Sequence, residues 1–362
     1  MSSLLYDQPV ALLRQAFRTA VTTDFSLFEH LRPIRSALVV FLVLCLTYTR
    51  ADVRALLPIG IGLLFVAIAD RGVSLRRRLT SMSAAAIAIT LGTFIGCLVS
   101  DNQVLHITIG GLAGLACGLA GLVGVPSMTA GVLGLVVFTI FSGSPIDLLN
   151  SKENTLLIVL GACLMIVSVL VEFVVRAALR ALPSVSDEMP VESVWQRTKF
   201  HLHWADPFIL HSIRLGIVIM VATALEEVLS FPHSYWIPMT VAWISRPDRD
   251  GTVEKVTLRV AGTLLGVVVA GLLIGLTSAT SAESLVMIAL AAYVVIAFLA
   301  PNYAVAVTGI TVFVFFLFHV VGYPMDGSIK ARVASTLIGA ALVLVAVRIG
   351  PRPRTETTLP TS

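Results

Sequence analysis

Long apolar runs, separated by short polar segments, recur along the whole chain. A helix that crosses the hydrocarbon layer of a membrane needs roughly 20 apolar residues, with about 17 to 25 tolerated. Twelve runs approach this length, and the second and eighth are short: 34–50, 55–69, 81–99, 104–122, 126–142, 155–175, 210–229, 233–245, 260–277, 284–300, 303–321 and 330–347. The pattern predicts an all-α polytopic membrane protein with about twelve transmembrane helices.

Lysine and arginine gather on alternate sides of these runs. If the N-terminus lies in the cytoplasm, all but five of the 25 basic residues fall on the cytoplasmic side, the exceptions being Arg50, Arg54, Lys152, Lys330 and Arg332. Cytoplasmic loops of membrane proteins carry such an excess of Lys and Arg. We therefore expect a multi-pass protein of the inner or plasma membrane with both termini cytoplasmic.

The two halves of the chain share identities at a constant offset of 179 residues. Residues 143–147 (GSPID) return as 322–326 (GYPMD), and Arg35 pairs with Arg214, Gly72 with Gly251, Gly92 with Gly271 and Gly96 with Gly275. Because each half holds an even number of spans, both halves would face the same way. The offset thus predicts two parallel six-helix repeats around a pseudo-twofold axis along the membrane normal, where a pathway can form.

Five segments follow from this division. They are an N-terminal cytoplasmic or interfacial segment (1–33), the first repeat (34–180), a cytoplasmic linker and interfacial segment (181–207), the second repeat (208–348) and a disordered cytoplasmic tail (349–362).

Composition supports a lipid environment and excludes several classes of protein. Apolar residues make up 57% of the chain and charged residues only 13%, whereas soluble domains are about a quarter charged. The net charge of +4 is too small for a nucleic-acid-binding surface. No nucleotide-binding loop, catalytic triad pattern or metal-ligand spacing is present. We expect no enzyme activity, no cofactor and no metal site.

Ionisable residues within the apolar runs are few. Glu172, Glu226 and Glu227 fall at the ends of predicted spans, while His106 and His319 lie inside them. We expect these histidines to be packed and hydrogen-bonded to neighbouring carbonyls rather than to relay protons. Proton-coupled carriers commonly use a carboxylate near the midplane, and its absence favours a channel-like, weakly coupled or partner-driven process.

Basic residues at the predicted cytoplasmic ends of the spans have two interpretations. Arg35 and Arg214 begin the first and seventh spans, and Arg259 precedes the ninth. The ordinary charge bias of membrane topology explains most of them. Alternatively, repeat-related arginines near an axis form a ring that attracts anions. His211 lies three residues before Arg214, on the same helix face.

The short eighth span contains Tyr235, Trp236 and Pro238. A short span interrupted by proline, with a counterpart in the other half, points to a binding site, and Pro58 in the short second span is the near counterpart. The two aromatic residues either belong to an outer aromatic belt or contact a ligand.

This segment resembles the signature of the fusaric-acid-resistance (FUSC) family. The matching stretches are 235–241 (YWIPMTV), 247–252 (PDRDGT) and 259–266 (RVAGTLLG), and the motif positions are Pro238, Pro247, Asp248, Gly251, Gly262, Thr263 and Gly266. His211 and Arg214 fit the usual start of the same module. The resemblance covers about residues 206–275 well, and the first half fits as a degenerate copy.

The resemblance implies an inner-membrane transporter, in several members an exporter of aromatic carboxylic acids. The family is similar to the plant aluminium-activated malate transporters, whose six-helix subunits pair around an axial pore. By this expectation the path lies between the halves and its binding residues are of three kinds. Basic side chains attract a carboxylate, aromatic side chains contact a ring and a hydroxyl lines the short helix: Arg35, Arg214, Arg259, His211, Tyr235, Trp236 and Thr240.

Two other functions fit the same pattern. One is a passive anion channel, whose flux would follow voltage and ignore a proton gradient. The other is a non-transporting scaffold that organises an envelope complex through its glycine-lined faces. The expected partners are the lipid bilayer, a small organic anion and either further copies of the chain or an envelope protein.

Overall fold

The computed structural model describes residues 22–50, 53–72, 74–143, 150–179, 206–229, 231–276 and 282–349, apart from the side chain of Asp326. Within these residues the secondary structure is helical, without strands. The predicted linker (181–207), the tail (349–362) and the first copy of the repeated GSPID stretch lie largely outside the described residues, as does most of the N-terminal segment.

Twelve of the described helices are longer than one 3-10 turn. In the first half they are α2 (Leu31–Arg50), α3 (Leu56–Ile68), α4 (Leu75–Val99), α5 (Gln103–Val123), α6 (Val125–Gly143) and α7 (Ser151–Ala178). In the second half they are α9 (Pro207–Leu229), α10 (Trp236–Ile244), α11 (Arg249–Ile274), α12 (Ala282–Phe298), α13 (Tyr303–Val321) and α14 (Met325–Ile349). Each predicted span coincides with one of them.

Nine helices in the described part of the chain are long and apolar enough to cross a membrane. The protein is therefore a multi-pass membrane protein. The others are α12, with 17 residues, and the two predicted short spans, α3 with 13 and α10 with 9. At about 1.5 Å per residue, neither α3 nor α10 covers a hydrocarbon layer roughly 30 Å thick.

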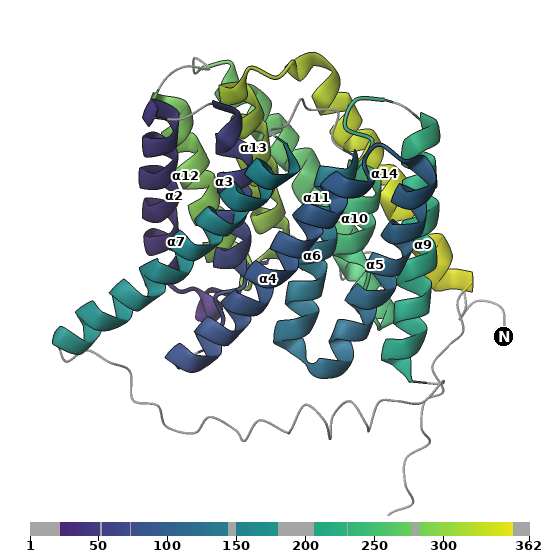
Figure 1. Ribbon diagram of the computed structural model, residues 1–362, viewed down its shortest axis with the longest axis horizontal. Coiled ribbons are helices and arrows are strands. Elements are labelled where there is room, and N and C mark those ends of the chain that lie inside the picture. The colour runs from purple at the N-terminus through teal and green to yellow at the C-terminus, as the bar shows by residue number, and fades with distance from the viewer. Residues whose placement is uncertain are drawn as a thin grey trace, which may run out of the picture.

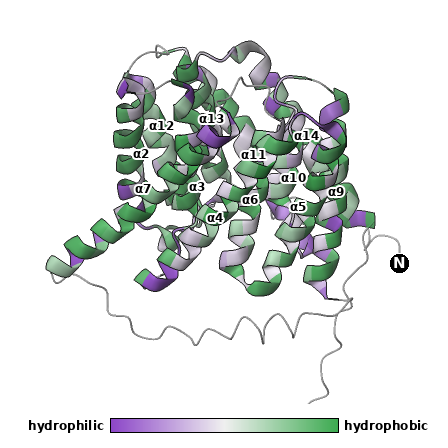
Figure 2. Ribbon diagram, in the orientation of Figure 1, coloured by the Kyte–Doolittle hydropathy of each residue, from purple (hydrophilic) through white to green (hydrophobic). Residues whose placement is uncertain are grey.

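The short helices lie inside the molecule (Figure 1). All 13 residues of α3 are buried, and α3, α10 and α13 contribute no large apolar side chain to the exposed surface of the described residues. The helices around them expose rows of apolar residues, such as Leu38, Leu42 and Leu46 on α2. The outward faces are mostly hydrophobic in Figure 2. Surrounding protein thus replaces lipid at the ends of α3 and α10.

The prolines of these short helices do not interrupt them. Pro58 and Pro238 each occupy the third residue of their helix, and no cis peptide bond occurs in the described chain. A backbone N–H has no partner within the helix in the first turn, so proline is accepted there without a kink. The prediction of proline-interrupted spans was wrong in this respect, whereas the short length was confirmed.

The helices pack in the same pairs in both halves. In the first half α4 packs with α6, α5 with α6, and α3 with α7; in the second, α11 packs with α13, α12 with α13, and α10 with α14. Between the halves, α5 packs along α9 and α12 packs along α2.

Glycines permit the closest of these crossings. A Cβ atom on Gly118 of α5 would lie 2.4 Å from the Cα of Ser212 on α9, and one on Gly262 of α11 would lie 2.3 Å from the carbonyl oxygen of Ala304 on α13. The offset-related glycines behave differently: Gly92 meets α6 closely, whereas Gly271 has no neighbour within 4 Å of the same atom. Small residues at helix crossings let backbones approach in membranes.

Candidate functional site

Arg35 lies in a charged cluster at the end of the bundle where α2, α4 and α7 meet. Its guanidinium pairs with Asp70 and Glu172. Arg78 pairs with the same two carboxylates, at 2.7 Å from Asp70 Oδ1 and 2.9 Å from Glu172 Oε2. Arg176 adds a contact of 2.7 Å to Glu172. The positive charge of Arg35 is therefore largely balanced within the protein.

The carboxylate of Asp70 holds this cluster together from the loop between α3 and α4. Burial alone would raise its pKa, but the hydrogen bonds and charges of Arg78 and Arg35 outweigh burial and lower the pKa of Asp70 below its ordinary value. The carboxylate thus stays ionised at neutral pH. Its two arginine partners come from different helices, so the cluster locks α2 and α4 to α3.

Arg214 stabilises the end of α10. Its Nη2 atom donates to the carbonyl oxygen of Arg246 at 2.5 Å and lies 3.3 Å from Nδ1 of His211. The carbonyl groups at the end of a helix lack partners within the helix, so a guanidinium there satisfies one of them. The expected proximity of His211 and Arg214 is confirmed.

The remaining motif positions between α10 and α13 are structural. Asp248 caps α11 by accepting a hydrogen bond from the Gly251 N–H at 2.7 Å. Gly262 and Gly266 face Ala304, Val307 and Thr311 of α13 at the helix crossing. Pro247 precedes the capping residue, and Thr263 is buried beside Gly262. These residues set the angle and depth at which α11 enters the bundle.

Tyr235 and Trp236 are both 1% exposed, which excludes the lipid-facing aromatic belt for these two side chains. They belong to an aromatic group in which Trp236 stacks on His233, with 4.6 Å between ring centroids, and lies parallel to Phe318 at 6.1 Å. His233 has a positive φ of 60°. This turn brings its ring under Trp236 at the start of α10.

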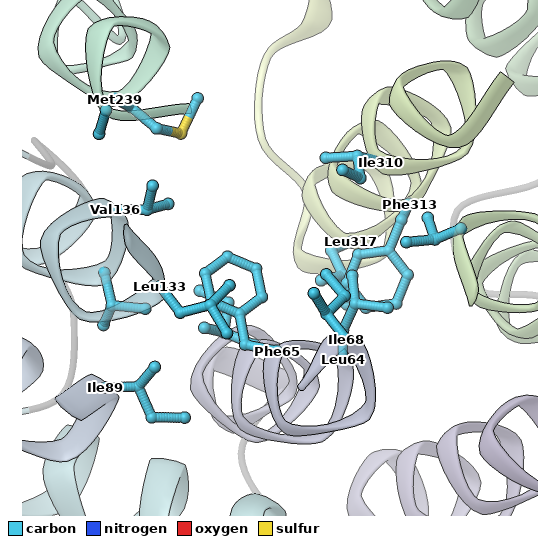
Figure 3. Packing of buried hydrophobic residues seen from close by; sticks show 14 of the residues in the cluster. Leu64, Phe65, Ile68, Ile89, Leu133, Val136, Met239, Ile310, Phe313 and Leu317 are labelled. Carbon is cyan, nitrogen blue, oxygen red and sulfur yellow. The ribbon is translucent and has the colours of Figure 1, made fainter. Parts of the chain in front are cut away.

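A central cavity of about 40 Å³ lies between the halves, beside Trp236. We use the name central cavity for the space lined by α3, α6, α10, α11, α13 and α14: Leu57, Ile61, Leu64, Phe65, Ile140, Tyr235, Trp236, Met239, Trp243, Arg259, Ile310, Phe313, Val314, Leu317, Phe318 and Arg332. Figure 3 shows Phe65, Met239, Ile310 and Phe313 around this space. The volume accommodates water or a carboxylate group, and an aromatic ring would require side chains to move.

Two fully buried arginines line this apolar cavity. Arg259 is 0% and Arg332 is 1% exposed. No nitrogen of either guanidinium has a hydrogen-bond partner among the described residues. Trp236 lies 4.8 Å from the Arg332 Cζ atom and Trp243 lies 5.8 Å from the Arg259 Cζ atom.

The energies show that these arginines need a partner. A cation–π contact contributes about 0.5–2 kcal/mol, whereas burying an unpaired ion costs several kcal/mol even after relaxation. The tryptophans therefore do not offset the burial of two like charges in one cavity. An anion or polar molecule bound between Arg259 and Arg332 would do so.

Further basic residues lead from the bundle end to this cavity. Arg71 and Arg246 are exposed near each other, and Lys255 on α11 has Arg71, Arg246 and Arg259 as its basic neighbours. Lys255 lies over the ring of Tyr303, with its Nζ atom 3.1 Å from the centroid. The series ends at Arg332, the basic neighbour of Arg259.

Of the predicted binding residues, the cavity brings together Arg259, Tyr235 and Trp236. Arg35, Arg214 and His211 lie elsewhere, in the contacts described above. Thr240 is fully buried on the side of α10 that packs against Gly339 of α14, and its hydroxyl has no hydrogen-bond partner among the described residues.

Sequence reasoning missed Arg332. The charge pattern had assigned Arg332 to the outer side as an ordinary topological charge, and its burial corrects that assignment. The available signal was its place within the predicted span 330–347, because ionisable residues inside spans are the usual markers of function.

Comparison with known proteins identifies the second half of the chain. Residues 220–346 match the family described as fusaric acid resistance protein-like. This match confirms the resemblance seen at 206–275 and extends it through α13 and α14. No solved structure matches the chain significantly.

Three curated relatives show the extent of the similarity. An uncharacterized protein of Haemophilus influenzae is 32% identical over 147 residues, 41% of this chain and 20% of that protein. The inner membrane protein YccS of Escherichia coli is 27% identical over 165 residues, 45% of this chain and 23% of its own length. An uncharacterized protein, ORF2, of Neisseria gonorrhoeae is 27% identical over 158 residues, 43% and 37% of the two chains. The match thus spans about a fifth of the first two relatives.

Proposed function

Because residues 220–346 of this multi-pass membrane protein form a fusaric-acid-resistance-like region, we propose that the protein transports small organic anions through the central cavity. The observation that carries the proposal is the pair of buried guanidinium groups without hydrogen-bond partners, Arg259 and Arg332. Opposite charge in a low-dielectric site is strongly favoured, so the cavity selects anions.

The lining of the cavity favours an aromatic carboxylate. Arginine matches a carboxylate through two parallel N–H groups, and Trp236, Trp243, Phe65 and Phe318 offer ring faces and edges around the same space. Tyr235 and Trp236 keep their predicted role as contacts for the substrate ring. Aromatic pairs add about 0.5–1.5 kcal/mol beyond area burial.

The proposed path runs between two parallel repeats. The offset of 179 residues aligns α2 with α9 and continues in order to α7 with α14, and the matching helix pairs within and between the halves support this arrangement. The cavity receives residues from the short helix of each half, α3 and α10. Such a location on a pseudo-twofold axis suits a pathway.

The proposed orientation is an inner-membrane protein with cytoplasmic termini. The name of the relative YccS places that protein in the inner membrane, and the basic series from Arg71 and Arg246 to Arg259 would collect anions from the cytoplasm for efflux. Cations along a narrow path raise the local concentration of anions and their rate of arrival.

Uptake of a labelled aromatic carboxylate into proteoliposomes tests the proposal. We expect Arg259→Gln and Arg332→Gln each to lower substrate affinity, because each removes a charge-assisted hydrogen bond of about 1.5–3 kcal/mol, roughly ten- to a hundredfold. Arg76→Gln, at an exposed position of α4, is the matched control and should leave flux unchanged.

The competing functions give distinct results in the same vesicles. Flux that follows membrane potential and ignores a pH gradient indicates the passive anion channel. Absence of flux for all tested anions, with a partner retained on gentle purification, indicates the scaffold. Wild-type flux in both cavity variants would refute the assignment of the anion to Arg259 and Arg332.

A further inference from the structure

The packed interface between α5 and α9 ends in buried ionisable side chains that the proposed anion contacts do not include. His106 lies one turn before Gly110 and continues the row of Gly110, Gly114 and Gly118 that faces α9. Its Nδ1 atom is 2.6 Å from Glu227 Oε1, and its Nε2 atom is 4.0 Å from Glu226 Oε2. The expected carbonyl partner of His106 is thus replaced by two carboxyl groups.

Glu226 is the least compensated of these groups. The side chain of Glu226 is 4% exposed and that of His106 is 1% exposed, whereas Glu227 is 26% exposed. Neither carboxyl oxygen of Glu226 has a hydrogen-bond partner among the described residues, nor does Nε2 of His106. An unpaired carboxylate in such a position costs several kcal/mol. A proton on Glu226 removes that cost, and an imidazolium at His106 reduces it.

The surroundings provide no other balancing charge close to Glu226. On the described part of α6 the neighbours are Phe138, whose ring centroid is 6.3 Å from that of His106, and Gly143. From the turn before α10 comes Tyr235, followed by His233, which lies 3.3 Å from the tyrosine hydroxyl. Arg332 of α14 lies beyond Tyr235 and His233. In the described residues no group of three or more His, Cys, Asp and Glu is arranged for a metal ion.

The carboxyl group of Glu226 adjoins the central cavity through Tyr235. A Cβ atom on Gly143 would meet both the Glu226 carboxyl group and, at 2.6 Å, the Cβ atom of Tyr235. Tyr235 in turn lines the central cavity together with Arg332. A negative charge on Glu226 therefore lies close enough to oppose an anion in the cavity, and a proton on Glu226 removes this repulsion.

We propose that Glu226, facing His106 at the end of the α5–α9 interface, is a proton-binding site whose protonated form admits the anion to the central cavity. The link to transport rests on the proposed function, whereas the proton site itself does not. The proton comes from water and returns to it, and no bond other than O–H or N–H changes. Because α5 and α9 belong to different halves, the same proton also adjusts the contact between them.

Two measurements test this site. Infrared difference spectra of the protein in lipid, recorded during a pH titration, should show a protonated carboxylic acid band that Glu226→Gln removes. Anion flux at zero membrane potential should fall about tenfold per pH unit above the titration midpoint, as the protonated fraction does. In Glu226→Gln, which mimics the neutral acid, flux should stay high and independent of pH. Glu283→Gln, at an exposed position on α12, should behave as wild type.

The outcomes separate the two proposals. Flux with an unchanged pH profile in Glu226→Gln, or a titrating band that persists in this variant, overturns the proton site and leaves the anion path standing. A band lost in Glu226→Gln without flux for any anion supports the proton site and contradicts the transport function.

Discussion

Arg35 and Arg332 show how one residue type takes opposite roles in the same membrane protein. Arg35 meets Asp70 and Glu172 and so contributes to a balanced cluster. Arg332 is fully buried with three nitrogens that have no hydrogen-bond partner in the described chain. Unpaired buried charge lowers stability, so a retained arginine of this kind indicates binding rather than packing.

The substitution Arg332→Met separates stability from function. We expect the free energy of unfolding in detergent to rise by about 1–4 kcal/mol, because a hydrophobic side chain of similar length replaces a buried ion. A bound anion should raise the melting temperature of the wild type and not of the variant. Thermal unfolding with and without an aromatic carboxylate measures both effects, with Arg76→Met as control. Equal stabilisation by the anion in both proteins would contradict the assignment.

Among the helices, close crossings depend on glycines at particular depths rather than on the glycine pattern as a whole. Gly262 and Gly271 lie on the same helix, α11, yet only Gly262 faces a neighbouring backbone, with a Cβ position 2.3 Å from the Ala304 carbonyl oxygen. Gly271 has no atom within 4 Å of that position. The offset of 179 residues aligns Gly271 with Gly92, although Gly92 is the one that packs closely.

Alanine substitutions at these two glycines form a matched pair. Gly262→Ala should destabilise the protein by about 1–3 kcal/mol, since the new methyl group forces α11 away from α13. Gly271→Ala should be neutral or stabilising by up to about 1 kcal/mol through helix propensity. Thermal melting of both variants in one detergent checks the difference. A similar loss at both positions would argue against the crossing of α11 and α13.

The whole molecule is layered, with α3, α10 and α13 inside and the longer helices around them. This layering explains how helices of 13 and 9 residues persist in a membrane protein, because their ends meet protein. It also brings the two short helices together at the central cavity.

A photoreactive lipid probe tests this layering in intact membranes. We expect labelling of outward residues on α2, such as Leu38 and Leu42, which are 54% and 56% exposed. Peptides from α3 and α10 should be labelled at least tenfold less, because protein separates them from the acyl chains. Peptide mass spectrometry after digestion measures the ratio. Comparable labelling of α3 and α2 would contradict an interior position for α3.

The sequence by itself determined where the helices lie and that lipid surrounds them. The prediction 104–122 corresponds to α5 at Gln103–Val123, and 233–245 to the shorter α10 at Trp236–Ile244. Runs of apolar residues have this predictive value because the thickness of the hydrocarbon layer sets the length of a span. The local motif Pro247-Asp248 followed by Gly251 likewise specifies the start of α11, since a cap needs only neighbouring residues.

Only the tertiary structure decided which charges are balanced and which are not. Arg35, Asp70 and Glu172 are far apart in the chain, and the pairing of Arg35 with both carboxylates depends on how α2, α3 and α7 pack. The same holds for His106 and Glu226, which meet because α5 runs along α9. A charge pattern along the sequence reports topology, whereas the partner of a buried charge is set by contacts between helices.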